Sequence, residues 1–513
     1  MQGRRQVSRS PALPRATVLI GALVLAQSAL AGTVPSFFSA GNLVVIVEGN
    51  GMVNAAANTQ TYLDDQASPM TLFQYKPTGT SSATYVNALV LPQTAAGKNL
   101  AVSAEYGSSS EGTLQLSGNG QYLTLMGYGV NAAAYNANPA MYGTALSNTG
   151  KSVTALAQSG SMTNQSVYTP VARVAVLING VGTVDSTTGL FNVFNDNNPR
   201  SAFSVDGSAF YVSGQGTSGD ATGGVFYAAK GSSSAVAITG LDTKSGPTKT
   251  PPNAPSAQDT RIVQVVNGQL LVSADSTQGV AASNRDFIGT LGAAGVLPTA
   301  LANNGAGPAQ LNGFGTSSTG MLKLTTSNGN SVNLAAAGKT VNLSPEGFFF
   351  ANASTLYVAD SGIPKNATAS STLGDGGLQK WTNSSSDGSG LWSLDYTLSS
   401  GLNLVANTAT AGSTGLLGLT GKVVGSEVQL FATNYTLGDT DPTFLFGISD
   451  TLLAMTKNAG ASFAMLATAP ADSTFKGVAF APTADASAVP EPSTTAMFVA
   501  GLGTLLMRRR QKS

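Results

Sequence analysis

The sequence contains neither cysteine nor histidine. Without cysteine the chain has no disulfide, no thiol nucleophile and no cysteine-based metal site. Without histidine it lacks the commonest general base and the commonest zinc ligand. A Ser-His-Asp hydrolase, a zincin and a haem protein with histidine ligation are therefore excluded.

Charged residues are also scarce, because they make up only 10% of the chain against about a quarter in an average protein. The 25 basic and 25 acidic residues balance overall, but eight of the basic residues and one acid lie in the two terminal segments. The body between these segments is therefore about −7. This charge argues against nucleic acid and anionic membrane surfaces as partners.

The C-terminal segment Val489–Ser513 holds a short uncharged apolar run, Ser493–Met507, between a tripeptide and a basic cluster. As a helix this run would be roughly 22 Å long, against a hydrocarbon core of about 30 Å, and snorkelling arginines can cover the difference. The tripeptide is Pro490, Glu491 and Pro492, and the basic cluster is Arg508, Arg509 and Arg510. Such arginines favour the cytoplasmic side, which predicts that the preceding chain lies across the membrane.

The N-terminal segment has the features of a secretory signal peptide. Four arginines precede the apolar run Ala16–Ala26, and Ala29-Leu30-Ala31 supplies small residues at the cleavage spacing. We therefore expect residues 1–31 to be removed after Ala31. A retained N-terminal anchor is the alternative.

The tripeptide, the apolar run and the arginine cluster together resemble the PEP-CTERM sorting signal of Gram-negative bacteria. The resemblance implies recognition and cleavage near the motif by exosortase, a membrane-associated cysteine protease. It also implies a protein that is anchored in the inner membrane before processing and then reaches the cell surface or the extracellular matrix. A plain tail anchor is the alternative.

The body predicts an all-β fold, because short β-rich runs alternate with turn residues and no amphipathic helical pattern persists. Asn267-Gly268, between Arg261–Val266 and Gln269–Ser273, is the clearest hairpin signal. The stretch Asn131–Gly160 is interpreted as an insertion, with Ala132–Ala134 in a loop. Further strands are predicted at Leu43–Val47, Thr61–Asp65, Thr71–Tyr75, Gly112–Leu116 with Tyr122–Tyr128, Ser201–Val205 with Ala209–Ser213, Gly347–Ala351 with Thr355–Ala359, Gly377–Trp381 with Leu391–Tyr396, and Gly415–Thr420 with Glu427–Thr433 and Thr443–Ile448.

A β-propeller over residues 41–483 fits this strand rhythm. At roughly 40–50 residues per blade the segment could hold about ten blades, and its long polar loops lower the expectation to about seven. Radial closure would remove exposed sheet edges, so we expect Leu43–Val47 to share a blade with Phe475–Phe480. A parallel β-helix and a pair of β-sandwiches are the alternatives.

Several stretches of the body resemble PEP-CTERM proteins with a propeller-like body. The resemblance implies the same fold and the same export, but it implies no reaction. The stretches are Gly41–Gly51, Pro345–Asp360, Gly376–Trp381, Gly415–Gly421 and Thr474–Pro482.

Candidate chemistry is sparse. Five aspartates near predicted strand ends are expected to cap turns, although a pair of them about 5–9.5 Å apart would suit a glycosidase. Calcium is the ion that the chain could hold, with oxygen ligands from Asp439-Thr440-Asp441 or Asn383–Asp387. Trp381 and Trp392, with Tyr396, are expected in the core rather than stacked on a sugar. The aspartates are Asp64, Asp65, Asp206, Asp360 and Asp375.

Five Asn-X-Ser/Thr sequences occur, as chance predicts in a chain rich in these residues. They begin at Asn164, Asn352, Asn366, Asn383 and Asn434. The leading hypothesis is a non-enzymatic binding or adhesion protein of the cell surface, associated with exopolysaccharide and processed by exosortase. The alternatives are a carboxylate-dependent polysaccharide hydrolase or lyase and a structural component of the matrix.

Overall fold

The computed structural model describes residues 36–51, 62–143, 155–162, 167–217, 221–239, 259–274, 287–303, 307–316, 322–323, 343–362, 376–405, 412–436 and 441–483. All of these belong to one compact unit, Pro35–Ala486. The predicted signal cleavage at Ala31 lies outside the described residues. So do the sorting residues Pro490, Glu491 and Pro492 and the arginines Arg508, Arg509 and Arg510.

The described residues form 27 β-strands, a short α-helix α1 (Ala132–Ala137) and a 3-10 turn (Pro139–Met141), which confirms the all-β prediction. The strands are β1 (Leu43–Gly49), β2 (Ala67–Thr78), β3 (Ser82–Val90), β4 (Ser103–Glu105), β5 (Gln115–Leu116), β6 (Tyr122–Tyr128), β7 (Arg173–Asn179), β8 (Val184–Leu190), β9 (Pro199–Phe203), β10 (Ala209–Gly214), β11 (Gly224–Ala229), β12 (Val236–Ala237), β13 (Thr260–Val266), β14 (Gln269–Ala274), β15 (Phe287–Leu291), β16 (Ala309–Gln310), β17 (Gly315–Thr316), β18 (Leu322–Lys323), β19 (Pro345–Asn352), β20 (Thr355–Asp360), β21 (Gly377–Asn383), β22 (Trp392–Leu398), β23 (Gly415–Val424), β24 (Glu427–Tyr435), β25 (Phe444–Thr451), β26 (Ala464–Thr468) and β27 (Ser473–Phe480).

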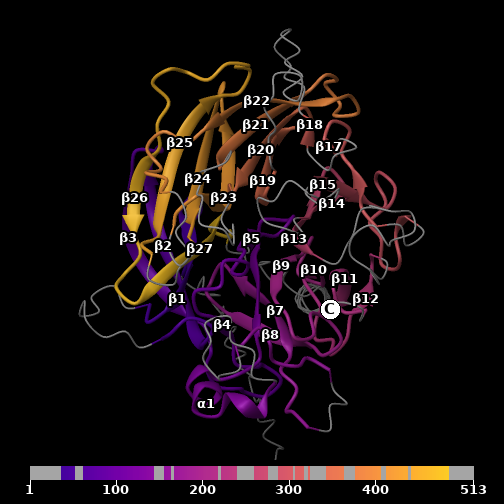
Figure 1. Ribbon diagram of the computed structural model, residues 1–513. Helices are drawn as coiled ribbons and strands as arrows, with labels where there is room; N and C mark the ends of the chain where they lie inside the picture. Colours follow the sequence, from indigo (N-terminus) through magenta and orange to yellow (C-terminus); the bar gives the residue numbers. More distant parts are fainter. Residues whose placement is uncertain are drawn as a thin grey trace, which may run out of the picture. The chain divides into compact units, whose positions relative to one another are not determined.

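The sheets have a propeller-like arrangement (Figure 1). Four separate four-stranded sheets are built from consecutive antiparallel strands: β9–β12, β13–β16, β19–β22 and β23–β26. A nine-stranded sheet holds β1–β8 together with β27, and β17 and β18 form a small pair. Figure 1 shows β5, β9, β13, β19, β23 and β27 nearest the middle, with β3, β26 and β12 farther out.

The expectation of about seven blades is wrong, because four separate blades are found. One physical reason is β4, which pairs with β2 through Ala67–Pro69 and with β6 through the Ser103–Tyr128 register. This bridge joins two sets of four strands, β27-β1-β2-β3 and β5-β6-β7-β8, into the single nine-stranded sheet.

The predicted pairing of the first and last strands is confirmed. β1 and β27 run antiparallel, with Leu43 opposite Phe480 and Val47 opposite Phe475. β1 pairs on its other side with β2, so the last strand of the body completes a sheet begun by the first. The pairing leaves β1 without a free edge, as closure of a β-fold requires.

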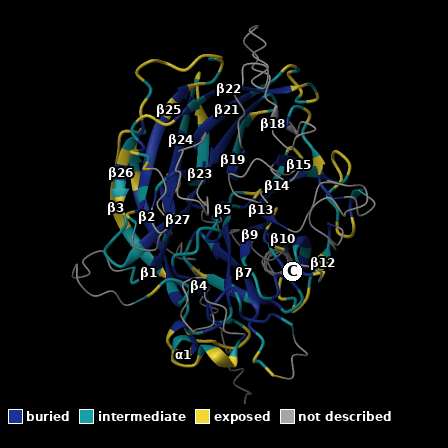
Figure 2. Ribbon diagram, in the orientation of Figure 1, coloured by how far each residue is buried: buried dark blue, intermediate teal, exposed yellow. Residues whose placement is uncertain are grey.

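Neighbouring strand sets pack face to face through hydrophobic clusters. One cluster joins β9–β11 to β13–β15, with Tyr211 and Val272 among its members. Others join β13–β15 to β19–β22, β20–β22 to β23–β25, and β24–β26 to β1, β2 and β27. Two more join β6–β8 to β9–β11 and β1–β2 to β6–β7. Figure 2 shows the buried residues along the strands, while exposed residues gather in loops, in α1 and on the outer strand β26.

The hairpin at Asn267-Gly268 is confirmed. Val266 lies opposite Gln269, and both turn residues have positive φ, 50° and 75°. Asparagine and glycine are the residues that tolerate this conformation, so the local sequence dictates the turn.

Most other predicted pairings are confirmed as well. They are β5 with β6, β9 with β10, β19 with β20, β21 with β22, β23 with β24, and β24 with β25.

Two local predictions are wrong. Ala132–Ala134 belongs to α1 rather than to a loop, because Asn131 caps the helix by accepting a 2.8 Å hydrogen bond from the Ala134 N–H. Residues 62–65 of the predicted strand Thr61–Asp65 are not a strand, because Asp64 and Asp65 lie in a turn and Asp65 has a φ of 68°. A strand cannot pass through this left-handed conformation.

Candidate functional site: the central pocket

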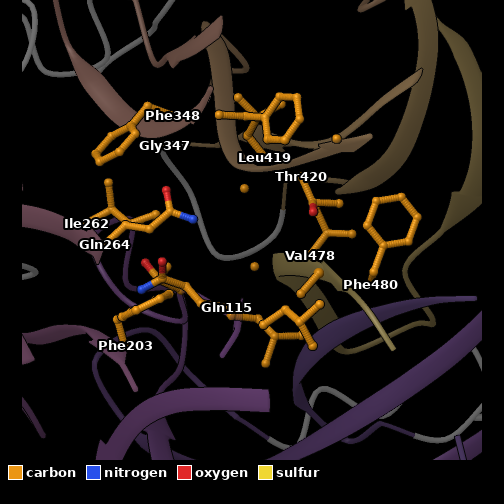
Figure 3. A pocket seen from close by; sticks show the side chains of 18 of the residues that line it. Gln115, Phe203, Ile262, Gln264, Gly347, Phe348, Leu419, Thr420, Val478 and Phe480 are labelled. Carbon is orange, nitrogen blue, oxygen red and sulfur yellow. The ribbon is translucent and has the colours of Figure 1, made fainter. Parts of the chain in front are cut away.

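A pocket of about 250 Å³ lies where the inner strands of the sets converge. Its walls come from β9, β13, β19, β23 and β27 and from β5 with the residues around it. Figure 3 shows Phe348 and Leu419 on one side, Gln264 and Gln115 on another, and Val478 and Phe480 opposite these amides. Because each strand set contributes its innermost strand, the pocket depends on the whole ring.

Glycines set the spacing of the inner strands. A Cβ added at Gly347 in β19 would lie 3.2 Å from the Leu417 carbonyl oxygen, and one at Gly418 in β23 would lie 3.0 Å from that of Lys476. A Cβ at Gly477 in β27 would collide with the backbone nitrogen of Leu114. Successive inner strands therefore lie so close together that a Cβ at Gly477 does not fit, and one at Gly347 or Gly418 would force neighbouring atoms to shift.

Side-chain hydroxyls on the second strands hold the inner strands in place. Thr124 Oγ1 in β6 donates to the Ala202 carbonyl in β9 at 2.7 Å. Ser213 Oγ in β10 donates to the Arg261 carbonyl at 2.6 Å, and Thr433 Oγ1 in β24 donates to the Lys476 carbonyl at 2.6 Å. The same kind of bond thus recurs from one strand set to the next and fixes the walls of the pocket.

Gln115 supplies the most constrained polar group in the wall. Its Nε2 donates to Ser201 Oγ at 2.8 Å and to the carbonyls of Ala202 and Val263 at 3.0 and 2.9 Å. Three acceptors around one nitrogen fix the orientation of the amide. The Gln115 Oε1 is buried and has no hydrogen-bond partner within the protein. The Gln264 Oε1 is likewise buried and has none.

The charged group in the wall is held in an ion pair. Glu346 in β19 lines the pocket, and its Oε2 lies 3.3 Å from Arg261 Nη1 in β13. Arg200 in β9 pairs with Asp259 in a similar way. Burial, and then the neighbouring Arg261 charge, lower the pKa of Arg200, although the guanidinium stays protonated at any physiological pH. These pairs link adjacent strand sets beside the pocket.

A second group of ionisable side chains is buried where β1, β4 and β27 meet. Glu48, Glu105 and Glu111 are each at most 5% exposed. Burial raises the pKa of all three carboxyls, and that of Glu48 rises to about 8 although Lys476 opposes the shift. Tyr128 Oη donates to Glu111 Oε1. None of the three carboxylates lines the pocket, so we assign them to the packing of the ring closure.

Of the aspartates singled out in the sequence, the four that the structure describes do not line the pocket. Asp206 caps a turn by accepting from the Ser208 N–H and Oγ at 2.9 and 2.6 Å, as expected. Asp360 is buried and accepts from the N–H groups of Ser344 and Gly362, both at 2.8 Å, and from Gln379 Nε2 at 3.1 Å. It therefore bonds across its sheet as well as within its own turn.

The other two described aspartates, Asp64 and Asp65, lie in a turn between β1 and β2. Asp375 lies outside the described residues.

The two tryptophans belong to the core, as expected. Trp381 stacks on Phe314 with ring centroids 4.2 Å apart, and Trp392 meets Phe350 edge to face at 5.8 Å. Tyr396 Oη donates to the buried Asp450 carboxylate, which also pairs with Lys380 at 2.9 Å.

Three of the predicted calcium ligands accept hydrogen bonds from backbone N–H groups of the protein. Asn383 Oδ1 accepts from the Ser385 N–H at 2.9 Å, Asp387 Oδ1 from the Ser389 N–H at 3.0 Å, and Asp441 Oδ2 from the Gly412 N–H at 2.8 Å. Asp439 lies outside the described residues. Within the part of the chain that the structure covers, no cluster of three or more acidic residues could hold a metal ion.

The glycosylation sequences differ in exposure. Asn352 is exposed, whereas Asn434 is 1% exposed and donates to Ser413 Oγ at 3.1 Å. Asn383 is partly buried, and its Nδ2 donates to the Gly388 carbonyl at 3.0 Å. Asn164 and Asn366 lie outside the described residues.

Sequence reasoning missed the two glutamines of the pocket. A signal for them exists, because each is a polar residue flanked by apolar ones: Gln115 lies between two leucines and Gln264 between two valines. The alternation of a half-buried strand would place such a residue on the face opposite its neighbours.

The comparisons with known proteins add no identity to this geometry. No family model matches the chain, and no curated protein matches it. Among the described residues, no helix has the length and apolar character needed to span a membrane.

Proposed function

We propose that the chain is an exported, non-enzymatic binding or adhesion protein of the cell surface or extracellular matrix, associated with exopolysaccharide through the central pocket. The observation that carries the proposal is a central pocket whose wall combines the amide side chains of Gln115 and Gln264 with phenylalanine rings. Amides can hydrogen-bond to sugar hydroxyls, and aromatic rings can pack against the apolar face of a sugar ring.

The lining of the pocket favours binding over turnover. Hydrolysis by the usual carboxylate mechanism needs two acids flanking the scissile bond. Glu346 is the single carboxylate among the described lining residues, and it is paired with Arg261. The proposal of a hydrolase or lyase therefore has less support than that of a binding protein.

The proposed location at the cell surface or in the extracellular matrix rests on the terminal segments. The leader before Ala31 would direct export, and exosortase would process the chain near Pro490, Glu491 and Pro492, after transient anchoring in the inner membrane. Changing Glu491 to alanine should leave the tail in place. The masses of the variant and of the wild type, both recovered from the host, measure this directly. A variant that is shortened at its C-terminus as the wild type is would reject exosortase as the processing partner.

Exopolysaccharide from the host, immobilised and incubated with the full-length chain, tests the binding function. We expect retention of the chain without release of new reducing ends. Release of reducing ends that a Glu346→Gln change abolishes would instead establish the hydrolase. Failure to be retained on any polysaccharide of the host would reject the proposed association.

A further inference from the structure

The central pocket contains acceptors that the fold itself leaves without donors. The three bonds made by Gln115 Nε2 fix its amide, so its Oε1 cannot exchange places with the nitrogen. Gln264 Oε1 shares the lack of a partner, although the Gln264 side chain makes no bond that the fold depends on. Because the Gln115 amide is fixed, the Gln264 amide is a polar group of the wall that can turn to meet a ligand.

The balance of charge in the wall defines a second property of the ligand. Arg261 neutralises Glu346, and the remaining described lining residues are uncharged. A cationic or anionic ligand would be desolvated without a counter-charge of its own, which is costly in a buried site. The ligand that fits is uncharged.

Shape supplies a third property. Aromatic rings from different inner strands, among them Phe203, Phe348 and Phe480, line the pocket and present apolar faces beside the two amides (Figure 3). The volume of about 250 Å³ is below the roughly 300–1,000 Å³ of pockets for drug-sized ligands. A single ring with an apolar face and a hydroxylated edge matches both features.

We infer that the central pocket binds one neutral sugar unit, whose hydroxyl groups form hydrogen bonds with the Gln264 amide while its ring lies against the phenylalanines. This inference deepens the proposed function and rests on it for the biological source of the sugar. It makes the pocket a site for an end unit of a polysaccharide, because the volume leaves little room for a longer chain.

The test measures binding of methyl glycosides of neutral hexoses to the full-length chain by saturation-transfer NMR and calorimetry. Glucosamine and glucuronate serve as charged counterparts. We expect at least one neutral glycoside to bind and both charged sugars to bind at least tenfold more weakly. Equal binding of a charged sugar, or binding of no neutral glycoside, would overturn the inference.

Two variants locate the binding. Gln264→Leu should lower the affinity for the neutral glycoside by about tenfold, because one hydrogen bond between protein and ligand is lost. Thr420→Phe should abolish binding by filling the pocket. The matched control is Gln429→Leu in β24, which does not line the pocket and should bind as the wild type does. Unchanged binding in both pocket variants would refute the site, and each variant is first compared with the wild type in its thermal unfolding.

Retention on host exopolysaccharide, measured in parallel, separates this inference from the proposed function. Retention that survives both pocket variants would refute the pocket as the sugar site while the adhesion function stands. Glycoside binding without retention on the polymer would support the pocket and reject the association with exopolysaccharide. Loss of both in the same variants is the expected result.

Discussion

Replacing Glu48 by glutamine should make the protein much more stable at pH 8 and change its stability by less than about 1 kcal/mol at pH 5. Glu48 is fully buried in β1, and neither of its carboxylate oxygens has a hydrogen-bond partner. The nearest cation, Lys476 Nζ in β27, lies 3.6 Å from Oε2. Glu111 is close enough to repel a charge on Glu48.

Two effects oppose each other at this carboxyl. The contact with Lys476 favours the ionised form, whereas burial favours the protonated form. Burial is the larger effect and raises the pKa of Glu48 from 4.5 to about 8. A contact of 3.6 Å without a hydrogen bond is too weak to compensate for full desolvation, so we expect Glu48 to be protonated at neutral pH.

The magnitude follows from the linkage between protonation and folding. Below pH 4.5 the carboxyl is protonated in both the folded and the unfolded chain, and its contribution is fully present. Between pH 4.5 and 8 the unfolded chain alone is ionised, so the free energy of unfolding falls by about 1.4 kcal/mol per pH unit. Over the whole interval the loss from Glu48 amounts to about 5 kcal/mol, and it is complete once the pH has risen through the folded pKa.

Glutamine is uncharged at every pH and nearly isosteric with the protonated acid, so Glu48→Gln should remove this part of the pH dependence. Urea unfolding of both proteins at pH 5, 6, 7 and 8 measures it. The control Glu427→Gln, at the solvent-facing start of β24, should keep the wild-type profile. A Glu48→Gln protein that is less stable than the wild type at every pH would refute the reasoning, because it would show an ionised Glu48 that neutralises Lys476.

Three further substitutions test other parts of the ring by urea or thermal unfolding. Gly477→Ala should cost about 1–3 kcal/mol through overpacking against the backbone near Leu114. Gly460→Ala should cost little, because its Cβ would make only an ordinary contact of 3.7 Å with Asn458 Oδ1. Equal losses would contradict the tight approach of the strands. Gly268→Ala should cost about 1 kcal/mol because the turn needs a φ of 75°, and an unchanged melting temperature would argue against this turn. Lys380→Met should cost about 3–5 kcal/mol by leaving Asp450 buried without its cation, and adding Asp450→Asn should recover much of the loss; a double variant no better than the single one would show that the pair is not coupled.

The sequence predicts those parts of the fold that depend on neighbouring residues. The β13–β14 hairpin is predicted because its two turn residues carry the required positive φ themselves. Asp206 is predicted as a turn cap because its partner, Ser208, lies two residues away. In both examples the signal and the structure occupy the same few positions of the chain.

Features that join distant residues were predicted less well. β4 is only Ser103–Glu105, has no hydrophobic pattern, and joins β2 to β6 through pairings that no local rule indicates. This one short strand changes the number of separate sheets. The cap of α1 by Asn131 is a local signal, but the asparagines and glycines around it favoured a loop.

The pairing of β1 with β27 was predicted from the sequence and the central pocket was not, although both depend on strands that are distant in the sequence. Strand pairing at the ring closure could be expected, because an all-β chain must cover its edges. The pocket could not, since it requires the register of strands from Thr113 to Phe480 to bring Gln115 and Gln264 to one wall. Val478 and Phe480 of β27 also line the pocket, and β27 is held by β1. The site is therefore complete only when the last strand has paired with the first, so any change that loosens the closure should weaken ligand binding as well as stability.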